Sequence, residues 1–118
     1  MINHNFRKLN IWKDEIQVAK ETYAMTRLFP KEERYGLSSQ IQHCSVSIPS
    51  NITEGSARST DKHSKQYLEN ALGSSFEWET QLIIAFEIEY ISIKTFEHLE
   101  NKIQHIQNQI IKFMNSFK

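Results

Sequence analysis

The chain has 118 residues and a mass of 13.9 kDa, which is enough for one domain, residues 1–118, and too short for two independent cores. Hydrophobic residues make up 39% and charged residues 24%, with only 3 Gly and 2 Pro, so collagen-like, linker-like and intrinsically disordered classes are excluded. Fourteen Lys and Arg balance fourteen Asp and Glu. This zero net charge excludes an overall positive field, so any binding to nucleic acid needs a local basic patch.

The cellular compartment is suggested by cysteine usage and by hydropathy. Cys44 is the single cysteine, so no disulfide can form within the chain. The first residues lack the apolar run of a signal peptide, and no segment approaches the ~18 uninterrupted apolar residues of a membrane span. We therefore expect a cytoplasmic protein that does not contact a membrane.

Two amphipathic helices are predicted in the first half of the chain, at about 9–28 and 37–58, from apolar residues spaced three and four apart. The apolar rows are Leu9, Trp12, Ile16, Ala19 and Tyr23 in the first helix, and Leu37, Ile41, Cys44, Ile48 and Ile52 in the second. Pro49 lies inside the second helix, where it removes a backbone hydrogen bond and crowds the carbonyl of Ser45. We expect the second helix to be kinked at Pro49.

Two more helices are predicted at about 61–89 and 93–117. Their rows are Leu68, Leu72, Ser75, Glu79, Leu82 and Phe86, and Phe96, Leu99, Ile103, Ile106, Ile110, Phe113 and Phe117. Ser59 or Thr60 is the expected N-cap of the third helix and Ser92 that of the fourth. Gly73 is expected at a close approach of another backbone. Short connections make successive helices antiparallel, so the fold class is all-α, an antiparallel up-down-up-down four-helix bundle.

No catalytic, cofactor-binding or metal-binding set emerges from the sequence. His98 and His105 lie about 10.5 Å apart along their helix, too far for two ligands of one zinc ion, and they are interpreted as surface residues. His43 and Cys44 are adjacent and point about 100° apart, with no second Cys or His-x-x-x-His pair. Enzymatic use of Glu79 or Glu54 as a base is a minor hypothesis, and we expect no enzyme.

A polar motif is formed by Asn51, Glu54 and Arg58, which share one face of the second helix. Glu79 stands in the apolar row of the third helix, with Gln81 beside it. One interpretation is a buried polar network that joins Glu79 and Gln81 to Asn51 or Arg58 and fixes the register of the helices. The other is an ordinary surface ion pair between Glu54 and Arg58.

Self-association is suggested by residues 82–88, which are apolar on every side of the third helix except at Glu87. Each helix of a four-helix bundle keeps an outer face, so some of these side chains need cover from outside the bundle. Another copy of the chain is the simplest cover, and Ile83, Ile84 and Ile88 are the expected contact residues of a homo-oligomer.

Charge is unevenly distributed along the chain. Residues 1–36 carry seven Lys and Arg against five acids, and residues 61–91 carry two Lys against six acids. Candidates for contact with nucleic acid are Arg7, Lys8, Lys13, Lys20, Arg27 and Arg58, and Lys102 and Lys112 of the last helix extend this basic surface. An ordinary solvated face has the same composition.

Several strings together resemble one protein family. They are FPKEERYGLSSQI at 29–41, VSIPSNI at 46–52 followed by Glu54 and Gly55, Gly73 and Ser74 leading to ETQL at 79–82, and FRKL at 6–9 with Trp12. The chain resembles the four-helix-bundle proteins encoded in intervening sequences of bacterial 23S rRNA genes, also described as ribosomal S23-like. Glu89 stands where relatives often have a Gly before Tyr90, so another turn geometry is expected there. Gln42 and His43 stand where relatives often have basic residues.

The resemblance implies a cytoplasmic bacterial bundle that assembles as a ring-like homopentamer with no known enzymatic activity. It also relates the chain to accessory subunits of diversity-generating retroelements, whose basic barrel binds a reverse transcriptase and nucleic acid. We therefore expect a homo-oligomeric module that binds RNA or an RNA-associated protein such as a reverse transcriptase. The alternative is a protein-interaction scaffold with no nucleic-acid contact.

Overall fold

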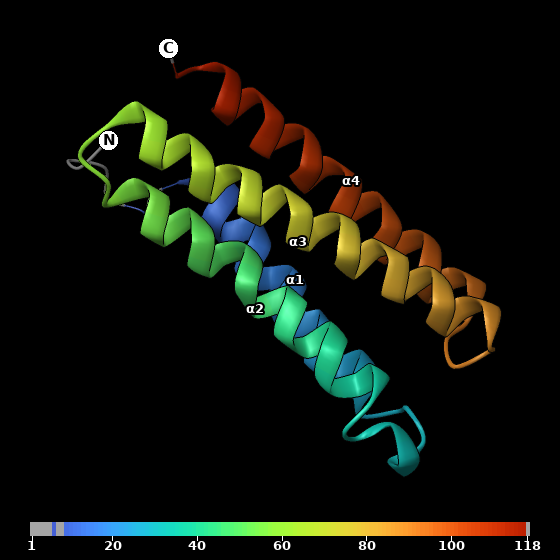
Figure 1. Ribbon diagram of the computed structural model, residues 1–118. Coiled ribbons are helices and arrows are strands. Elements are labelled where there is room, and N and C mark those ends of the chain that lie inside the picture. Colours follow the sequence, from blue (N-terminus) through green and yellow to red (C-terminus); the bar gives the residue numbers. More distant parts are fainter. Residues whose placement is uncertain (1–5, 7–8, 118) are drawn as a thin grey trace.

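The computed structural model describes Phe6 and residues 9–117. Four helices pack side by side in a body that measures 43 × 24 × 21 Å, with the two connections that follow α1 and α3 at one end (Figure 1). The helices are α1 (Asn10–Thr26), α2 (Leu37–Ser56), α3 (Asp61–Glu87) and α4 (Ile93–Asn115), with a short 3-10 turn at Lys31–Glu33. The predicted all-α four-helix bundle is confirmed, and the described helix bounds lie within three residues of the predicted ones.

The core is built from the rows predicted for α2 and α4. In α2 the buried apolar residues are Ile41, Cys44, Ile48 and Ile52, and in α4 they are Leu99, Ile103, Ile106 and Ile110. The ends of the α4 row, at Phe96, Phe113 and Phe117, are only partly buried. In α3, the indole of Trp78 is completely buried and donates from Nε1 to Thr22 Oγ1 of α1 at 3.1 Å.

The buried face of α1 differs from the predicted one. Of the predicted row, Leu9, Trp12, Ile16 and Ala19 are half-buried and Tyr23 is 42% exposed. The buried row lies one to two residues away and consists of Ile11, Glu15, Val18, Thr22 and Met25. A carboxyl and a hydroxyl interrupt this row, so apolar spacing alone did not reveal it. Thr22 compensates by donating to the carbonyl of Val18 at 2.7 Å.

Helix capping follows the sequence. Thr60 Oγ1 accepts from the backbone N–H of His63 at the start of α3, and Ser92 Oγ accepts from that of Thr95 at the start of α4, as predicted. The helix α2 continues through Pro49 to Ser56, and a kink at Pro49 stays a prediction.

The glycine that marks a close approach is Gly55 and not Gly73. A Cβ at Gly73 would have no atom within 4 Å, because this face of α3 is exposed. A Cβ at Gly55 would lie 3.2 Å from both the carbonyl oxygen of Ser64 and Tyr67 Cβ. The expectation for Gly73 was therefore wrong, and the contact it described occurs near the turn between α2 and α3.

The turn after α3 keeps the left-handed geometry that glycine usually supplies. Glu89 has φ of 66°, and the next residue, Tyr90, donates its backbone N–H back to the carbonyl of Ala85 at 2.8 Å. The expectation of another turn geometry at Glu89 was wrong, because the fold holds a side-chain-bearing residue in a strained conformation.

None of the helices in the described part of the chain is both long enough and apolar enough to cross a bilayer.

Candidate nucleic-acid interface

Three of the predicted basic residues lie on one row, two on α1 and Arg27 at its C-cap. Lys13, Lys20 and Arg27 are seven residues apart, so successive Cα atoms are separated by about 10 Å along the helix axis. All three are exposed, and none forms an ion pair with a described residue. Arg7 and Lys8, which were predicted to belong to the same surface, lie outside the described residues.

Arg58 is engaged in a different way from the cations of α1. Its Nη2 lies 3.2 Å from Glu54 Oε2, its Nε donates to the carbonyl of Glu54, and its guanidinium carbon lies 5.3 Å from the ring centroid of Tyr67. The pair is solvent-exposed, with side-chain exposures of 37% for Arg58 and 55% for Glu54. Arg58 is therefore already bound within the chain, as the surface ion pair interpretation has it.

The five residues of the predicted polar network fall into four separate groups among the described residues. Arg58 pairs with Glu54 as above, and Asn51 Nδ2 donates to the carbonyl and hydroxyl oxygens of Ser47 within α2. In α3, the buried Gln81 donates to Gln40 Oε1 at 3.5 Å.

Glu79 faces the other side of the bundle. Its carboxylate accepts from Gln107 at 2.8 Å and from Gln104 at 3.3 Å, both on α4. The amides of α4 therefore satisfy Glu79, and the structure does not join it to Asn51 or Arg58.

The seam between α1 and α4 is lined by a ladder of polar pairs that sequence reasoning missed. Glu21 accepts at 2.7 Å from His98 Nε2 and lies 3.3 Å from Lys102 Nζ. Burial alone would raise the pKa of Glu21, but the hydrogen bonds and charges of His98 and Lys102 outweigh it and lower the pKa. Lys102 is thus engaged within the bundle, unlike the exposed cations of α1.

Further along the same seam, Asp14 accepts from Gln109 Nε2 at 3.1 Å and lies 3.9 Å from His105 Nε2. The signal was present in the sequence, because the two carboxylates are seven residues apart and so are the two histidines. The two histidines are too far apart to share a metal ion, and each of them faces its own carboxylate.

Next to this ladder, Glu15 is buried inside the bundle. Its side chain is 1% exposed, and neither carboxyl oxygen has a described hydrogen-bond partner. Desolvation raises the pKa of Glu15 well above its usual value, and the nearby charge of Asp14 adds to this. Glu15 faces the core, away from solvent, where it has no described route to a substrate.

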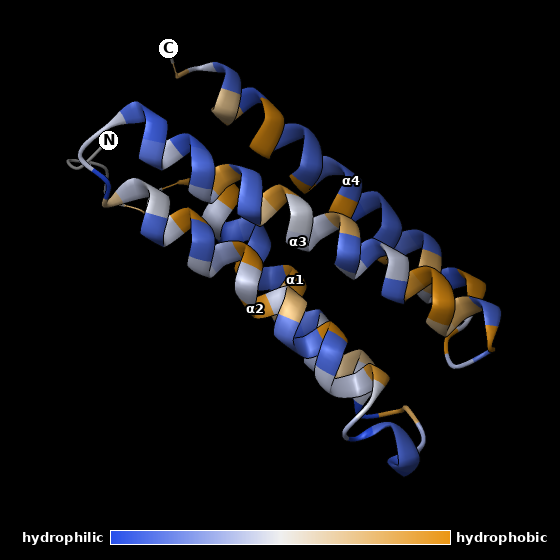
Figure 2. Cartoon of the chain, in the orientation of Figure 1, coloured by the Kyte–Doolittle hydropathy of each residue, from blue (hydrophilic) through white to orange (hydrophobic). Residues whose placement is uncertain are grey.

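The predicted contact residues of an oligomer are exposed on α3. Ile83, Ile84 and Ile88 are 40%, 45% and 48% exposed, and Phe76 on the same helix is 48% exposed. Figure 2 shows hydrophobic colour gathered on α3 close to the α3–α4 connection. The single chain therefore leaves these side chains uncovered.

In the described part of the chain, no group of three or more His, Cys, Asp or Glu side chains could hold a metal ion. Cys44 is free and buried, and desolvation raises the pKa of its thiol to about 11.

Comparisons with known proteins agree with this architecture. Residues 7–112 match the sequence model of a family described as 23S rRNA-intervening sequence protein. The fold is similar to the crystal structure of a protein with unknown function from the S23 ribosomal protein family of Bacteroides thetaiotaomicron. That similarity has a TM-score of 0.80 at 21% sequence identity and covers 88% of this chain and 97% of the other. No curated protein matches the sequence.

Proposed function

The chain belongs to the 23S rRNA-intervening sequence protein family, and from this premise we propose that it is a non-enzymatic RNA-binding bundle that assembles from several copies into a ring. The observation that carries the proposal is the exposed row of Lys13, Lys20 and Arg27 on α1. Cations without an intramolecular partner are free to neutralise phosphates and to release the counterions that surround RNA.

The uneven distribution of acidic and basic residues within the chain supports the proposal of RNA binding. The acidic partners that could neutralise the row, Asp14 and Glu21, are turned toward α4 and hold His105, His98 and Lys102. The excess acidity of the chain is concentrated between residues 61 and 91, mostly on α3. One helix can therefore present a basic surface although the net charge of the chain is zero.

Self-association is the second part of the proposal. Phe76, Ile83 and Ile84 of α3 and Ile88 directly after it are exposed apolar side chains, which a second copy would remove from water. A ring of five copies, as the family resemblance implies, repeats the basic row of α1 around the assembly. Repetition of a weak basic surface raises affinity through multivalency.

RNA binding is tested with the double variant Lys13→Gln/Lys20→Gln. We expect wild-type protein to bind a fluorescent single-stranded RNA in anisotropy titrations, with affinity falling steeply between 50 and 200 mM salt. The double variant should bind more weakly, with a log–log salt slope smaller by about 1.4, which is about 0.7 for each phosphate of a single strand that is no longer neutralised. Lys62→Gln/Lys65→Gln removes equal charge from α3 and is the matched control. Absence of wild-type binding at 50 mM salt overturns RNA binding and favours a protein-interaction scaffold.

Assembly is tested by sedimentation at micromolar concentration. The wild-type species should have a mass near five times 13.9 kDa, and Ile84→Lys should shift it toward the single chain. Asn108→Lys introduces the same charge at an exposed polar position of α4 and should leave the mass unchanged. A wild-type species of 13.9 kDa alone would contradict the ring.

A further inference from the structure

A hollow of about 660 Å³ lies where the end of α1 meets the connection to α2 and the first turns of α2. Its walls include three cations, the ring of Tyr23 and the polar side chains of Ser38 and Gln42; the cations are Arg27, Lys31 and Arg34. None of the described residues that line it is a carboxylate. The volume falls within the ~300–1,000 Å³ that is usual for sites that take small ligands.

The three cations have no acidic partner in the described part of the chain. This distinguishes them from Arg58 and Lys102, which are held by Glu54 and Glu21. Arg34 is oriented by an aromatic contact, since its guanidinium carbon lies 5.2 Å from the ring centroid of Tyr35, a residue that is 85% exposed. The hollow therefore offers positive charge that nothing described in the chain neutralises.

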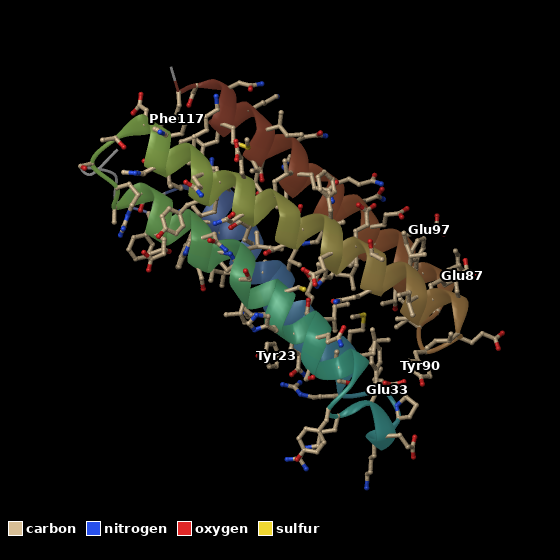
Figure 3. The ribbon with its side chains drawn as sticks, in the orientation of Figure 1. Tyr23, Glu33, Glu87, Tyr90, Glu97 and Phe117 are labelled. Atoms are coloured by element: carbon tan, nitrogen blue, oxygen red, sulfur yellow. The ribbon has the colours of Figure 1, made fainter. Side chains whose placement is uncertain are left out.

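The two carboxylates of the same connection are close to the neighbouring loop. Tyr90 donates from its hydroxyl to Glu33 Oε2 at 2.7 Å, and this bond is the main cause of the raised pKa of Tyr90. The charge of Glu32 also contributes to that shift, so it too acts near Tyr90. Figure 3 shows Glu33 beside Tyr90 and places Tyr23 apart from both. Within residues 31–34, the two cations therefore line the hollow, whereas the two carboxylates lie near Tyr90.

The segment that carries the cations is tied to the rest of the bundle. Glu33 Oε1 accepts the backbone N–H of Leu37 at the start of α2, at 3.1 Å. The ring of Phe29 packs against that of Tyr90 with centroids 5.3 Å apart. A ligand that binds here would therefore meet groups that are already in place, and less conformational entropy is lost on binding.

The combination of groups matches the parts of a nucleotide. Tyrosine rings stack on bases, Arg and Lys bind phosphate oxygens, and amide and hydroxyl groups can bind base edges. Tyr23 is 42% exposed, so part of its ring surface is accessible. Gln42 donates Nε2 to Thr26 Oγ1 at 2.9 Å, and its side-chain oxygen Oε1 has no described partner. An acidic protein segment would use the cations but not the ring of Tyr23.

We propose that this hollow receives one unstacked nucleotide of a single-stranded RNA, with its base against Tyr23 and its flanking phosphates on Arg27, Lys31 and Arg34. The inference rests on the RNA-binding function proposed above and deepens it. Arg27 belongs both to the hollow and to the basic row of α1, so the strand continues from the hollow along Lys20 and Lys13. The protein therefore selects single strands, because a base inside a duplex cannot reach Tyr23.

The test measures anisotropy of three labelled probes of equal length: single-stranded oligouridine, an RNA duplex and a strand of the same backbone without bases. Wild-type protein should bind the single strand at least about 5-fold more tightly than the other two. Tyr23→Ala should weaken binding of oligouridine by about 5-fold or more and leave the base-free strand unaffected. Lys31→Gln/Arg34→Gln should reduce the salt slope by about 1.4 for the single strand and for the base-free strand.

Controls separate the hollow from the rest of the surface. Tyr67→Ala removes a tyrosine of α3 that lies beside the far end of α2, and it should not change the affinity. Melting followed by circular dichroism confirms that each variant folds. If Lys13→Gln/Lys20→Gln weakens binding whereas the Tyr23 and Lys31/Arg34 variants bind as wild type, the nucleotide site in the hollow is overturned and the proposal that the protein binds RNA is retained. If no probe binds at 50 mM salt, the proposed function fails as well. If polyglutamate competes as well as oligouridine, the hollow recognises acidic protein and the nucleotide assignment is overturned.

Discussion

The helices α2 and α3 meet through small side chains, whereas α1 and α4 are joined by charged ones. Between α2 and α3, Ser64 donates its hydroxyl to the carbonyl of Gly55 at 2.9 Å, and the hydroxyls of Ser47 and Ser74 lie 2.9 Å apart. Contacts of this length between short side chains require the two backbones to approach closely. We therefore expect the stability of this seam to depend on close packing more than on pH or salt.

The seam between α1 and α4 depends on charge. Its ladder of Asp14, Glu21, His98, Lys102 and His105 is accessible to solvent at the edges, and side-chain exposure reaches 67% at His105. Interactions of this kind are weakened by salt and by protonation of the carboxylates. One bundle therefore combines a helix pair that is held by close packing, α2 and α3, with a seam between α1 and α4 whose stability is expected to depend on pH and salt.

The largest effect is expected at the shape-dependent seam, for Gly55→Val. The new side chain would meet the carbonyl oxygen of Ser64 and Tyr67 Cβ, each 3.2 Å from the position of Cβ. Overpacking of this kind costs about 1–3 kcal/mol of unfolding free energy, measurable by urea denaturation. Gly73→Ala is the control, because nothing lies within 4 Å of its Cβ, and it should raise stability by about 0.5–1 kcal/mol. Equal stability of Gly55→Val and wild type would show that the seam is not tight.

Glu15 lies beside the charged seam but has no partner within it, which makes Glu15→Leu the next test. Removing a buried carboxyl whose two oxygens are unpaired should stabilise the protein by about 1–3 kcal/mol at pH 7. The raised pKa means that the folded state keeps a proton that the unfolded state loses, so the contribution of Glu15 to stability falls as pH rises above about 4.5. The Leu variant should lose this pH dependence.

The matched variant Glu15→Gln abolishes ionisation and keeps a polar group in the core. It should lose the same pH dependence and gain less stability than Glu15→Leu. If denaturation curves of wild type and both variants shift in parallel between about pH 5 and 8, Glu15 is not buried as described.

The sequence predicted the fold well because α2 and α4 carry uninterrupted apolar rows. It placed the buried face of α1 incorrectly because Glu15 and Thr22 occupy core positions. The Thr22 hydroxyl is tolerated there because it donates to the carbonyl of Val18 and accepts from the distant Trp78. Similarly, spacing alone could not say which of Gly55 and Gly73 faces another helix.

The site was predicted less completely than the fold. The row of Lys13, Lys20 and Arg27 could be read from seven-residue spacing within one helix. The addition of Lys31 and Arg34 depends on how the connection after α1 folds back, and that path is fixed by contacts between Glu33 and Tyr90, which are 57 residues apart. Local sequence patterns do not predict a contact between residues so far apart in the chain.

A change outside both seams separates local backbone strain from packing between helices. Glu89→Gly should stabilise the protein by about 1 kcal/mol, because glycine adopts φ of 66° without the steric cost of a Cβ. Thermal denaturation at two salt concentrations should give the same gain at both. Glu89→Ala keeps the Cβ and is the matched control; a gain for Ala as large as that for Gly would mean that removal of charge, and not relief of strain, is the cause.

The smallest effect is expected at the charged seam, for Glu21→Gln, which should lower stability by about 0.5–1 kcal/mol at neutral pH and low salt. Burial acts against ionisation of Glu21, but the bonds from His98 and Lys102 lower its pKa, so its contribution is present above the unfolded pKa and lost as pH falls through the folded one. The difference between wild type and variant should therefore disappear in acid, and it should shrink in 1 M salt. Glu54→Gln, at the exposed pair with Arg58, should cost less. If instead the loss of unfolding free energy caused by Gly55→Val falls with salt while that caused by Glu21→Gln stays constant, packing does not dominate the seam between α2 and α3 and charge does not dominate the seam between α1 and α4.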